Sequence, residues 1–381
     1  MRARFLTFLA LVACSNTNTM TTSDASAAPS MAANEDYALC RGAPAPAMCA
    51  SGSRVASCGV CIQRPNTRYP LARTRCDDTI RREYCVEAMG TAPNLGCFAP
   101  GAVTPGESRR VTMYGTFKVF GNGGDSHHVR ITVYRPMADG SPGEMLGSTV
   151  SDIEAPGNAT EDVYSPSRDR VIQTRRLGAY QLPNIPTETE LLVVTEGDPA
   201  DMTASALFSH RIYDYNIMLR NAEVDMPAAP MGVPGPAVRF DPRVLSNSDW
   251  QAIPSAATLV TGIPQGHGVL AGEVHDCDNV RLANAMVSSE PRQLWSGGTV
   301  YFSENDTNPL PDMSRNGRGT SLLGTYALLD MGPGPTTVAA VGVDTTGRLQ
   351  HLGSYRARIY PDSVTVVTFR GLRPWQAGPR P

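Results

Sequence analysis

The sequence predicts a mainly β protein in which two β-sandwiches follow a small disulfide-rich module. The 381 residues include 35 glycines and 31 prolines, and the apolar segments between them are short, which favours strands joined by turns. Seven of the nine cysteines lie between residues 40 and 97. A set of strands that includes a Gly-x-Tyr-x-Leu segment also occurs twice in the chain.

Residues 1–14 are typical of an export signal. Arg2 and Arg4 precede a mostly apolar stretch, residues 5–13, which is followed by Cys14. The stretch is too short to span a bilayer, which needs about 20 apolar residues. The Leu11-Val-Ala-Cys14 segment resembles the lipobox of bacterial lipoproteins. The resemblance implies cleavage before Cys14 and a lipid on its sulfur, and several acyl chains anchor a protein stably. The alternative is an ordinary signal peptide with a chance cysteine.

The residues after Cys14 fit an exported, tethered protein. Ser15 rather than aspartate follows the cysteine, which in Gram-negative lipoproteins implies delivery to the outer membrane. Residues 15–37 are rich in Ser, Thr, Asn, Ala and Met without apolar periodicity, so we expect a disordered tether. The formal net charge of −3 gives no basic field for nucleic acid. We expect no membrane contact apart from the lipid.

Residues 38–98 are expected to form the cysteine-rich module. Its few large apolar residues make a small core, which disulfides would have to stabilise. The candidates for disulfide bonding are Cys40, Cys49, Cys58, Cys61, Cys76, Cys85, Cys97 and Cys277. Pairing cannot be deduced from spacing. Because the module holds seven cysteines, either one thiol stays free or Cys277 reaches back to it. Residues 77–84 are typical of a short helix with an acidic first turn.

Two alternatives use the Cys58-Gly-Val-Cys61 spacing. A zinc site would need a second pair of ligands, and neither a second C-x-x-C nor a C-x-x-H follows. A redox dithiol would need a βαβ unit around the pair, and the flanking residues predict none. Disulfides are therefore the favoured interpretation.

The internal repeat defines the two predicted sandwiches. Leu177-Gly-Ala-Tyr-Gln-Leu182 recurs as Leu323-Gly-Thr-Tyr-Ala-Leu328, and each copy precedes a turn and an apolar strand. Further strands are expected at residues 111–119, 129–133 and 191–194 in the first copy. The second copy has them at residues 269–274, 285–287, 338–341 and 363–369. Strand 129–133 alternates apolar and polar residues, as a half-buried strand does. Each tyrosine is expected to bury its ring and to place its hydroxyl at an end of the sandwich.

The second copy carries a family resemblance. Gly272-Glu-Val-His-Asp and the following Ala285-Met-Val287 match the G-x-V-x-D opening and A-x-V of carboxypeptidase regulatory-like domains. Gly347 and strand 363–369 fit the end of that family's pattern. The resemblance implies prealbumin-like β-sandwiches at residues 99–225 and 266–373. Residues 226–265 would be a linker with a short helix near Ser246, anchored by Trp250. Residues 374–381 would be a tail.

The sequence offers no recognised catalytic site. No His-x-x-Glu, H-E-x-x-H, G-x-S-x-G or P-loop motif occurs. Four further features each allow a functional and a structural interpretation. Gly124-Asp-Ser126 is favoured as a hairpin turn over an esterase block, and His127-His128 as surface histidines over a metal site. His275-Asp-Cys-Asp278 is favoured as a turn with a disulfide over a metal or thiol site. The loop at residues 304–308 with Asp312 is favoured as a solvated loop over a calcium site.

These observations predict a non-catalytic lipoprotein of the outer membrane, facing the periplasm or the surface, whose sandwiches act as binding or spacing modules. An envelope glycan or another envelope protein would be the partner, and we expect no catalytic residue, metal or cofactor. An accessory role through the cysteine-rich module, with the sandwiches as a stalk, is the main alternative. An enzyme with an unrecognised site is the other.

Overall fold

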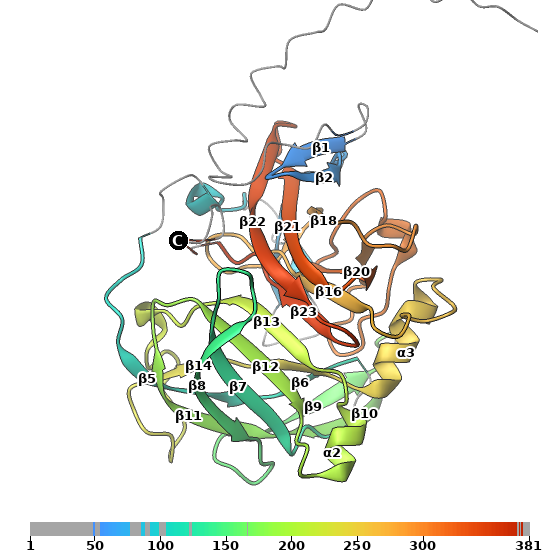
Figure 1. Cartoon of the computed structure of the whole chain (residues 1–381). Helices are drawn as coiled ribbons and strands as arrows, with labels where there is room; N and C mark the ends of the chain where they lie inside the picture. Colours follow the sequence, from blue (N-terminus) through green and yellow to red (C-terminus); the bar gives the residue numbers. More distant parts are fainter. Residues whose placement is uncertain are drawn as a thin grey trace, which may run out of the picture.

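A computed structural model describes residues 49, 54–76, 85–87, 92–98, 104–121, 124–165, 167–371, 373 and 375. These residues are mainly β, with the two short helices α2 (Met202–Leu207) and α3 (Asn247–Ala256) (Figure 1). Short 3-10 helices lie at Gly96–Phe98, Asn221–Glu223 and Met313–Arg315. The predicted signal segment, the predicted tether and the helix expected at residues 77–84 lie outside the described residues.

One eight-stranded sheet runs through both predicted sandwiches. In spatial order its strands are β19 (Val300–Tyr301), β20 (Thr325–Met331), β16 (Gly268–Glu273), β23 (Val364–Val367), β13 (Ile212–Ile217), β12 (Leu191–Gly197), β7 (Val129–Pro136) and β8 (Pro142–Val150). The two halves meet where β13 pairs in parallel with β23, with Ile212 opposite Val364 and Tyr215 opposite Val367. The strands of the two repeats therefore share one hydrogen-bonded sheet, as the middle of Figure 1 shows.

Strand pairing repeats between the two halves. In the first half β5 (Arg110–Thr116) pairs antiparallel with β11 (Ala179–Pro186) and parallel with β14 (Ala237–Arg239). In the second half β16 has the same relation to β20 and β23. Likewise, β12 lies between β7 and β13, and β21 (Gly334–Val343) lies between β18 (Met286–Glu290) and β22 (Leu349–Ile359), all antiparallel. The internal repeat seen in the sequence is thus also a repeat of strand order.

Each repeat contains a glycine opposite the tyrosine of its Gly-x-Tyr-x-Leu segment. Gly115 is the partner of Tyr180, and Gly272 is the partner of Tyr326. The Tyr180 hydroxyl donates to the Phe240 carbonyl at 2.7 Å, and the Tyr326 hydroxyl donates to the Val367 carbonyl at 2.6 Å. A Cβ on Gly272 would lie 1.9 Å from the Val367 oxygen.

The same approach occurs in the first repeat, where a Cβ on Gly115 would lie 2.0 Å from the Phe240 oxygen. Glycine is therefore required for the close approach of the neighbouring strand. Both tyrosine rings are buried, as predicted. Each hydroxyl is buried and donates to a backbone carbonyl, as buried polar groups do.

Part of the predicted linker belongs to the sheets. Residues 237–239 form β14, and β15 (Arg243–Leu245) pairs in parallel with β6 (Lys118–Phe120). Helix α3 follows, and the Ser246 hydroxyl accepts from the Asp249 amide at 3.2 Å, so the predicted N-cap is confirmed. Trp250 packs on the adjoining core and stacks on His210 with ring centroids 4.0 Å apart. A separate hairpin joins β9 (Ala159–Tyr164) to β10 (Val171–Leu177).

The described strands of the cysteine-rich segment pack on the second repeat. Hairpin β1 (Arg54–Ser57) and β2 (Val60–Gln63) contacts β18 and β21. Strand β3 (Ala72–Cys76) pairs with β4 (Cys85–Glu87) and with β17 (Leu282–Ala283). Val60, Ile62 and Leu71 belong to the same hydrophobic core as β16, β21 and β22. The segment thus gains core stability from its neighbour in addition to its disulfides.

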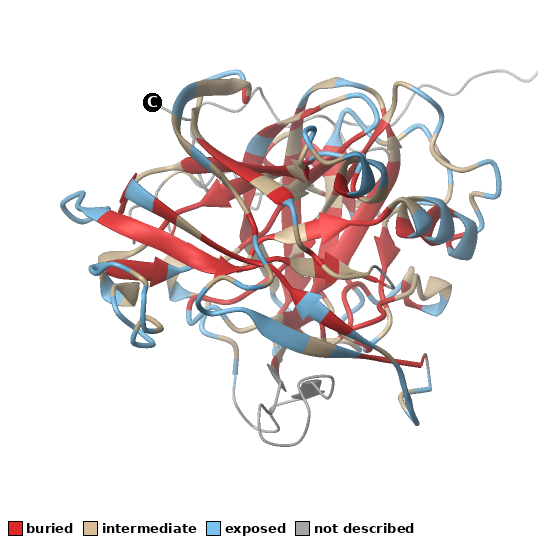
Figure 2. Ribbon diagram, turned by 90° about the horizontal axis from the view of Figure 1, so that it is seen from below, coloured by how far each residue is buried: buried red, intermediate tan, exposed pale blue. Residues whose placement is uncertain are grey.

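Burial follows the strand pattern (Figure 2). Val129, Ile131 and Val133 are fully buried on β7 and Arg130 is only half-buried, as the predicted alternation requires, but Thr132 is buried as well. Strand β23 differs, because Val364, Thr365 and Val367 are all buried. Its position in the middle of the eight-stranded sheet places packed side chains on both faces, as expected for a central strand.

Candidate functional site

A pocket of about 420 Å³ lies on one face of the eight-stranded sheet, where the two repeats join. Its floor is formed by β13, β23, β16 and β20. Because successive side chains of a strand point to opposite faces, Ile212 and Asp214 line the pocket, whereas Tyr213 and Tyr215 enter the core on the other face. A pocket of this volume is within the range used by small-molecule ligands.

The floor changes from apolar to polar along the strands. The first row consists of Ile212, Val364, Val269 and Leu329, and the next row of Asp214, Val366, Ala271 and Ala327. Thr368, Glu273 and Thr325 lie further along the same strands. A ligand in this pocket would therefore contact hydrocarbon at one end and charged groups at the other.

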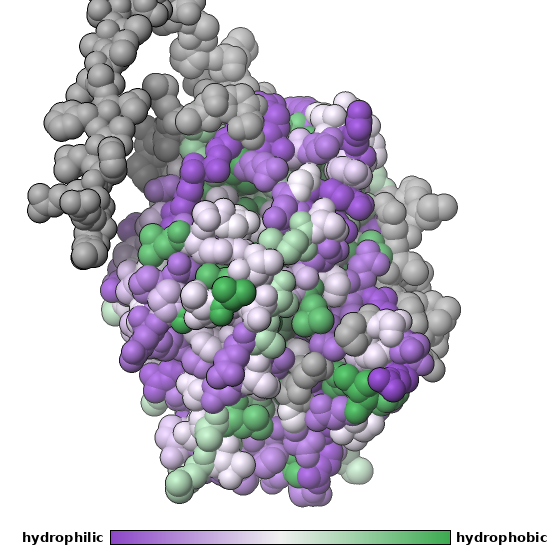
Figure 3. Space-filling model, turned by 90° about the vertical axis from the view of Figure 1, so that its right-hand side faces the viewer, coloured by the Kyte–Doolittle hydropathy of each residue, from purple (hydrophilic) through white to green (hydrophobic). Residues whose placement is uncertain are grey.

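Aromatic side chains form the walls at the apolar end. Phe120 of β6 contacts Phe302 edge to face, with ring centroids 5.5 Å apart. Helix α3 contributes Trp250 and Ile253, and Leu245 of β15 lies beside them. On the outer face of the molecule that includes α3, hydrophobic residues form separate spots among hydrophilic ones (Figure 3). The apolar side chains at this end of the pocket thus surround a space large enough for a ring.

A network of ion pairs closes the polar end. Glu273 accepts from Arg243 at 3.2 Å, from Arg281 at 3.3 Å and from the His275 ring at 2.8 Å. Asp306 pairs with Arg281 at 3.3 Å. Burial by itself would raise the pKa of Glu273, but Arg281, His275 and Arg243 hold that pKa well below its usual range. Glu273 is therefore charged, and its carboxylate is fully paired with neighbouring side chains of the protein itself.

Asp214 and Arg370 are different, because neither takes part in that network. The Asp214 Oδ1 atom and the Arg370 Nε atom are buried and have no hydrogen-bond partner among the described residues. Burial raises the pKa of Asp214 to about 7, Arg370 and Arg243 oppose the rise, and Glu273 adds to it. Their charges interact, yet no ion pair joins these two side chains. A carboxyl group with a strongly shifted pKa in a pocket marks a candidate binding site.

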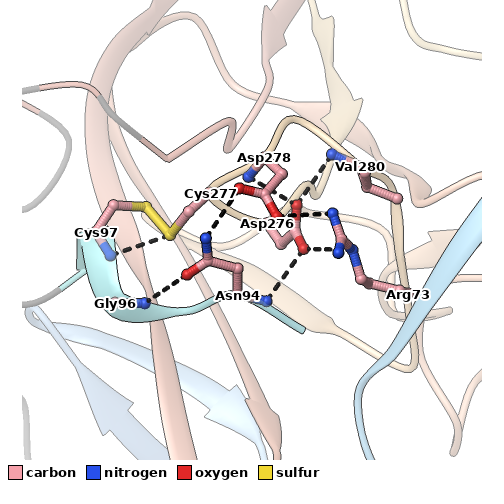
Figure 4. The surroundings of a disulfide bond; sticks show 8 residues. All are labelled: Arg73, Asn94, Gly96, Cys97, Asp276, Cys277, Asp278 and Val280. Carbon is pink, nitrogen blue, oxygen red and sulfur yellow. Dashed lines mark hydrogen bonds and ion pairs between the residues drawn. A yellow bond between two sulfur atoms is a disulfide. The ribbon is translucent and has the colours of Figure 1, made fainter. Parts of the chain in front are cut away.

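The His275-Asp-Cys-Asp278 segment is a turn with a disulfide, as favoured from the sequence. Asp276 Oδ1 accepts from the amides of Asp278 and Val280, both at 3.0 Å. Cys277 is bonded to Cys97, so Cys277 does reach back to the cysteine-rich segment. Figure 4 shows Asp276 also paired with Arg73 at 2.9 Å.

The other cysteines are only partly described. Cys61 is bonded to Cys49, and Cys58 is also disulfide-bonded, so Cys58 and Cys61 form neither a dithiol nor a zinc knuckle. Cys76 and Cys85 are backbone partners in the β3–β4 pairing. Cys14 and Cys40 lie outside the described residues.

The structure does not bring the remaining sequence candidates together at one site. The Asp125 carboxylate accepts a hydrogen bond from Arg176. The buried Ser126 hydroxyl donates to the Phe117 carbonyl at 2.8 Å. His128 is exposed and pairs with Asp201. Within the described ranges, no group of three or more His, Cys, Asp or Glu side chains is placed to hold a metal ion.

The prediction of a solvated loop at residues 304–308 is wrong. Asn305, Thr307 and Asn308 are buried. Asn305 donates to the Ser165 carbonyl at 2.9 Å, and Thr307 accepts from the Tyr164 amide at 3.1 Å. The polar side chains therefore satisfy backbone groups of the β9–β10 hairpin, which a sequence pattern cannot distinguish from hydration.

Sequence reasoning missed the pocket itself. Asp214 stands in Ile212-Tyr-Asp-Tyr-Asn-Ile217, where a carboxylate interrupts an apolar strand, and Arg370 directly follows the strand predicted at residues 363–369. A charge inside a strand with two buried faces is the signal that could have identified Asp214.

Comparisons with known proteins assign no family. No family model and no curated protein matches the chain. The solved shaft pilin SpaA of Lactobacillus rhamnosus GG aligns at 10% identity over 68% of this chain and 97% of the pilin, with a TM-score of 0.16. A proposed adhesin of Bacteroides ovatus ATCC 8483 aligns at 9% identity over 67% and 92%, with a TM-score of 0.12. These TM-scores are too low to assign fold or function.

The described helices include none that is long and apolar enough to cross a membrane.

Proposed function

We propose that this protein is an exported, lipid-anchored binding module of the bacterial envelope that receives a small amphipathic ligand in the pocket between its two repeats. The lipobox-like segment ending at Cys14 supports the anchor and the outer-membrane address. The repeated strand order supports two prealbumin-like sandwiches. The module acts by binding rather than by catalysis.

The unpaired Asp214 and Arg370 beside an apolar pocket carry the proposal. Unpaired buried polar atoms destabilise a fold by about 1–3 kcal/mol each, so a fold retains them where a ligand or water completes them. The rest of the pocket is apolar floor and satisfied ion pairs. This arrangement suits a ligand with a hydrocarbon body and one polar group.

The single lysine of the chain gives a direct test. Lys118 lines the pocket and is the only lysine in the sequence. We expect the neutral dye N-phenyl-1-naphthylamine to fluoresce on binding and to slow acetylation of Lys118 by an amine-reactive reagent, measured by peptide mass spectrometry. The test uses the soluble ectodomain, residues 37–381, whose free α-amino group provides the internal reference for labelling.

A variant that fills the floor completes the test. Ala271→Phe should abolish dye fluorescence, whereas Met202→Ala, at an 88% exposed residue outside the pocket, should leave it unchanged. Equal thermal midpoints show that both variants fold. Dye binding without protection of Lys118 would place the ligand elsewhere and reject the pocket.

The anchor needs a separate measurement. Cys14→Ala should abolish incorporation of labelled palmitate and shift the protein from the membrane fraction to the soluble fraction. Unchanged membrane association in that variant would contradict lipid anchoring.

A further inference from the structure

We propose that Asp214 and Arg370 together bind an amide-type group, such as a primary carboxamide or a lactam, whose aromatic or short aliphatic body fills the apolar end of the pocket. This inference rests on the proposed pocket function and specifies the ligand's chemical class. An amide presents an N–H donor and a C=O acceptor on adjacent atoms. The carboxyl group of Asp214 accepts the first, and the guanidinium of Arg370 donates to the second.

The arrangement of these two residues favours a group with both properties. Asp214 is on β13, which pairs directly with β23, and Arg370 lies three residues beyond the end of β23, directly after the bridge between Phe369 and Val274; both residues line the pocket. Each side chain is partly buried, and each has a polar atom without a partner. Their charges interact without an ion pair. A ligand group that bridges the two side chains would give each of their unpartnered polar atoms a hydrogen bond.

A singly charged ligand would complete only one of them. An ammonium group would pair with Asp214 and leave Arg370 without an acceptor. A carboxylate would pair with Arg370 and face the carboxyl group of Asp214. Leaving a buried partner unsatisfied lowers affinity, because the group has lost its water without gaining a hydrogen bond.

The charge balance of the whole pocket also favours a neutral ligand. Four acidic residues, Asp214, Asp241, Asp249 and Glu273, and five basic residues, Lys118, Arg239, Arg243, Arg281 and Arg370, line it. Arg239 pairs with Asp241 at 2.8 Å, and Glu273 is paired as described. Asp306, outside the lining, pairs with Arg281 and makes the numbers of acidic and basic residues equal, so the pocket has no strong net field for an ion.

The apolar end determines the rest of the ligand. Phe120, Phe302 and Trp250 offer aromatic faces, and Ile212, Val269 and Val364 form the adjacent floor. Rings pack on such surfaces by edge and offset contacts. A flat, one- or two-ring body therefore suits this end better than a polar sugar.

Four probes with one body test the inference. Binding of naphthalene-2-carboxamide, naphthalene-2-carboxylate, 2-(aminomethyl)naphthalene and 2-ethylnaphthalene to the full ectodomain is measured by protection of Lys118 and by calorimetry. We expect the carboxamide to bind at least tenfold more tightly than each of the other three. A site that hydrogen-bonds both polar atoms of a ligand discriminates by at least this factor against an analogue that leaves one of the site's groups unpaired.

Matched variants assign the effect to the two residues. Asp214→Leu and Arg370→Met should each reduce the carboxamide's advantage over 2-ethylnaphthalene to less than about threefold. Asp139→Leu, at an exposed carboxylate outside the pocket, is the control and should retain the full advantage. Thermal midpoints monitor folding, and Arg370→Lys provides a milder change if Arg370→Met fails to fold.

The outcomes separate the two proposals. Binding of all four probes with equal affinity overturns the amide inference and leaves the pocket function standing. Tightest binding by the amine or by the carboxylate also overturns it, since a single ion contact then dominates. Failure of every probe to protect Lys118 rejects the pocket function itself.

Discussion

Asp214 affects both the stability of the fold and the proposed binding of a ligand. Its neighbours in the same row of the pocket floor are Val366, Ala271 and Ala327, none of which can donate a hydrogen bond from its side chain. Burial therefore disfavours its charged form, and its pKa rises to about 7. The ordinary value for an aspartate in an unfolded chain is about 3.9. The folded state thus binds a proton that the unfolded state has released.

The resulting pH dependence is a first prediction. The pKa of Asp214 is higher in the folded state than in the unfolded state. Its contribution to the free energy of unfolding is therefore favourable below about pH 4 and is lost as pH rises toward 7. Asp214→Asn removes the titration, so at pH 8 it should stabilise the protein by about 1–3 kcal/mol. At pH 4 the two proteins should have similar unfolding free energies.

Urea unfolding at both pH values measures the difference. Asp139→Asn is the control, since the Ser141 hydroxyl and amide lower the pKa of Asp139. If Asp214→Asn were as stable as the natural chain at pH 8, or less stable, the charged Asp214 carboxylate would have to be compensated by its surroundings in the folded state.

Gly272 carries a second prediction at this scale. Gly272→Ala places a methyl group 1.9 Å from the Val367 carbonyl oxygen and 2.9 Å from the Tyr326 hydroxyl. The β16 and β23 strands must separate, and we expect a loss of about 3 kcal/mol or more in unfolding free energy. Gly317→Ala is the control, because no atom lies within 4 Å of its Cβ position. A thermal midpoint of Gly272→Ala within 1–2 °C of the control would contradict the requirement.

At the scale of elements, the two described disulfides differ in the loop that each closes. Cys49–Cys61 spans 12 residues, whereas Cys97–Cys277 spans 180. Chain-entropy reasoning assigns about 3 kcal/mol to the first and about 5 kcal/mol to the second. Hydrogen bonds reinforce the longer link, because the Cys277 amide donates to the Asn94 carbonyl at 2.9 Å.

We therefore predict a larger loss from the longer link. Cys97→Ala/Cys277→Ala should lower the unfolding free energy by about 2 kcal/mol more than Cys49→Ala/Cys61→Ala. Chemical denaturation of the oxidised proteins measures both. An equal or smaller loss would mean that the Arg73–Asp276 contacts hold the segments together without the bond.

Helix α3 supports the pocket wall through its first turn. Ser246→Ala removes the cap that accepts from Asp249, at a cost of about 1 kcal/mol, and should weaken dye binding by loosening Trp250. Ser255→Ala, at an exposed position later in the helix, is the matched control. Unchanged dye affinity in Ser246→Ala would mean that the N-cap of α3 is not needed to hold the pocket wall in place.

Sequence patterns predicted the elements better than their partners. The alternation of Val129, Ile131 and Val133 gave the correct faces, since burial on one face of a strand is a local property. The parallel pairing of Ile212 with Val364 joins segments with no local signal in common, so neither it nor the pocket could be predicted. Gly115 and Gly272 are intelligible only once the strand beside each is known.

On the scale of the whole molecule, the two repeats share both a sheet and a core. Leu192, Tyr213 and Tyr215 of the first repeat pack in one cluster with residues of the second repeat and of hairpin β1–β2. Separation of the halves would expose this cluster and the unpaired edges of β13 and β23.

The chain should therefore unfold in a single thermal transition. Calorimetry should give one peak, and tryptophan fluorescence and far-ultraviolet circular dichroism should report the same midpoint. Two resolved transitions, one of them retained in a fragment of residues 104–245, would show that the repeats are independent.

The Cys97–Cys277 bond also determines how the molecule would carry mechanical load. Tension that enters from the N-terminal side reaches Cys97 and passes through a covalent bond directly into the second repeat. The residues between the two cysteines, which include the whole first repeat, form a closed loop that this force bypasses. A chain held by its N-terminal end can thus be pulled without stretching the strand that carries Asp214.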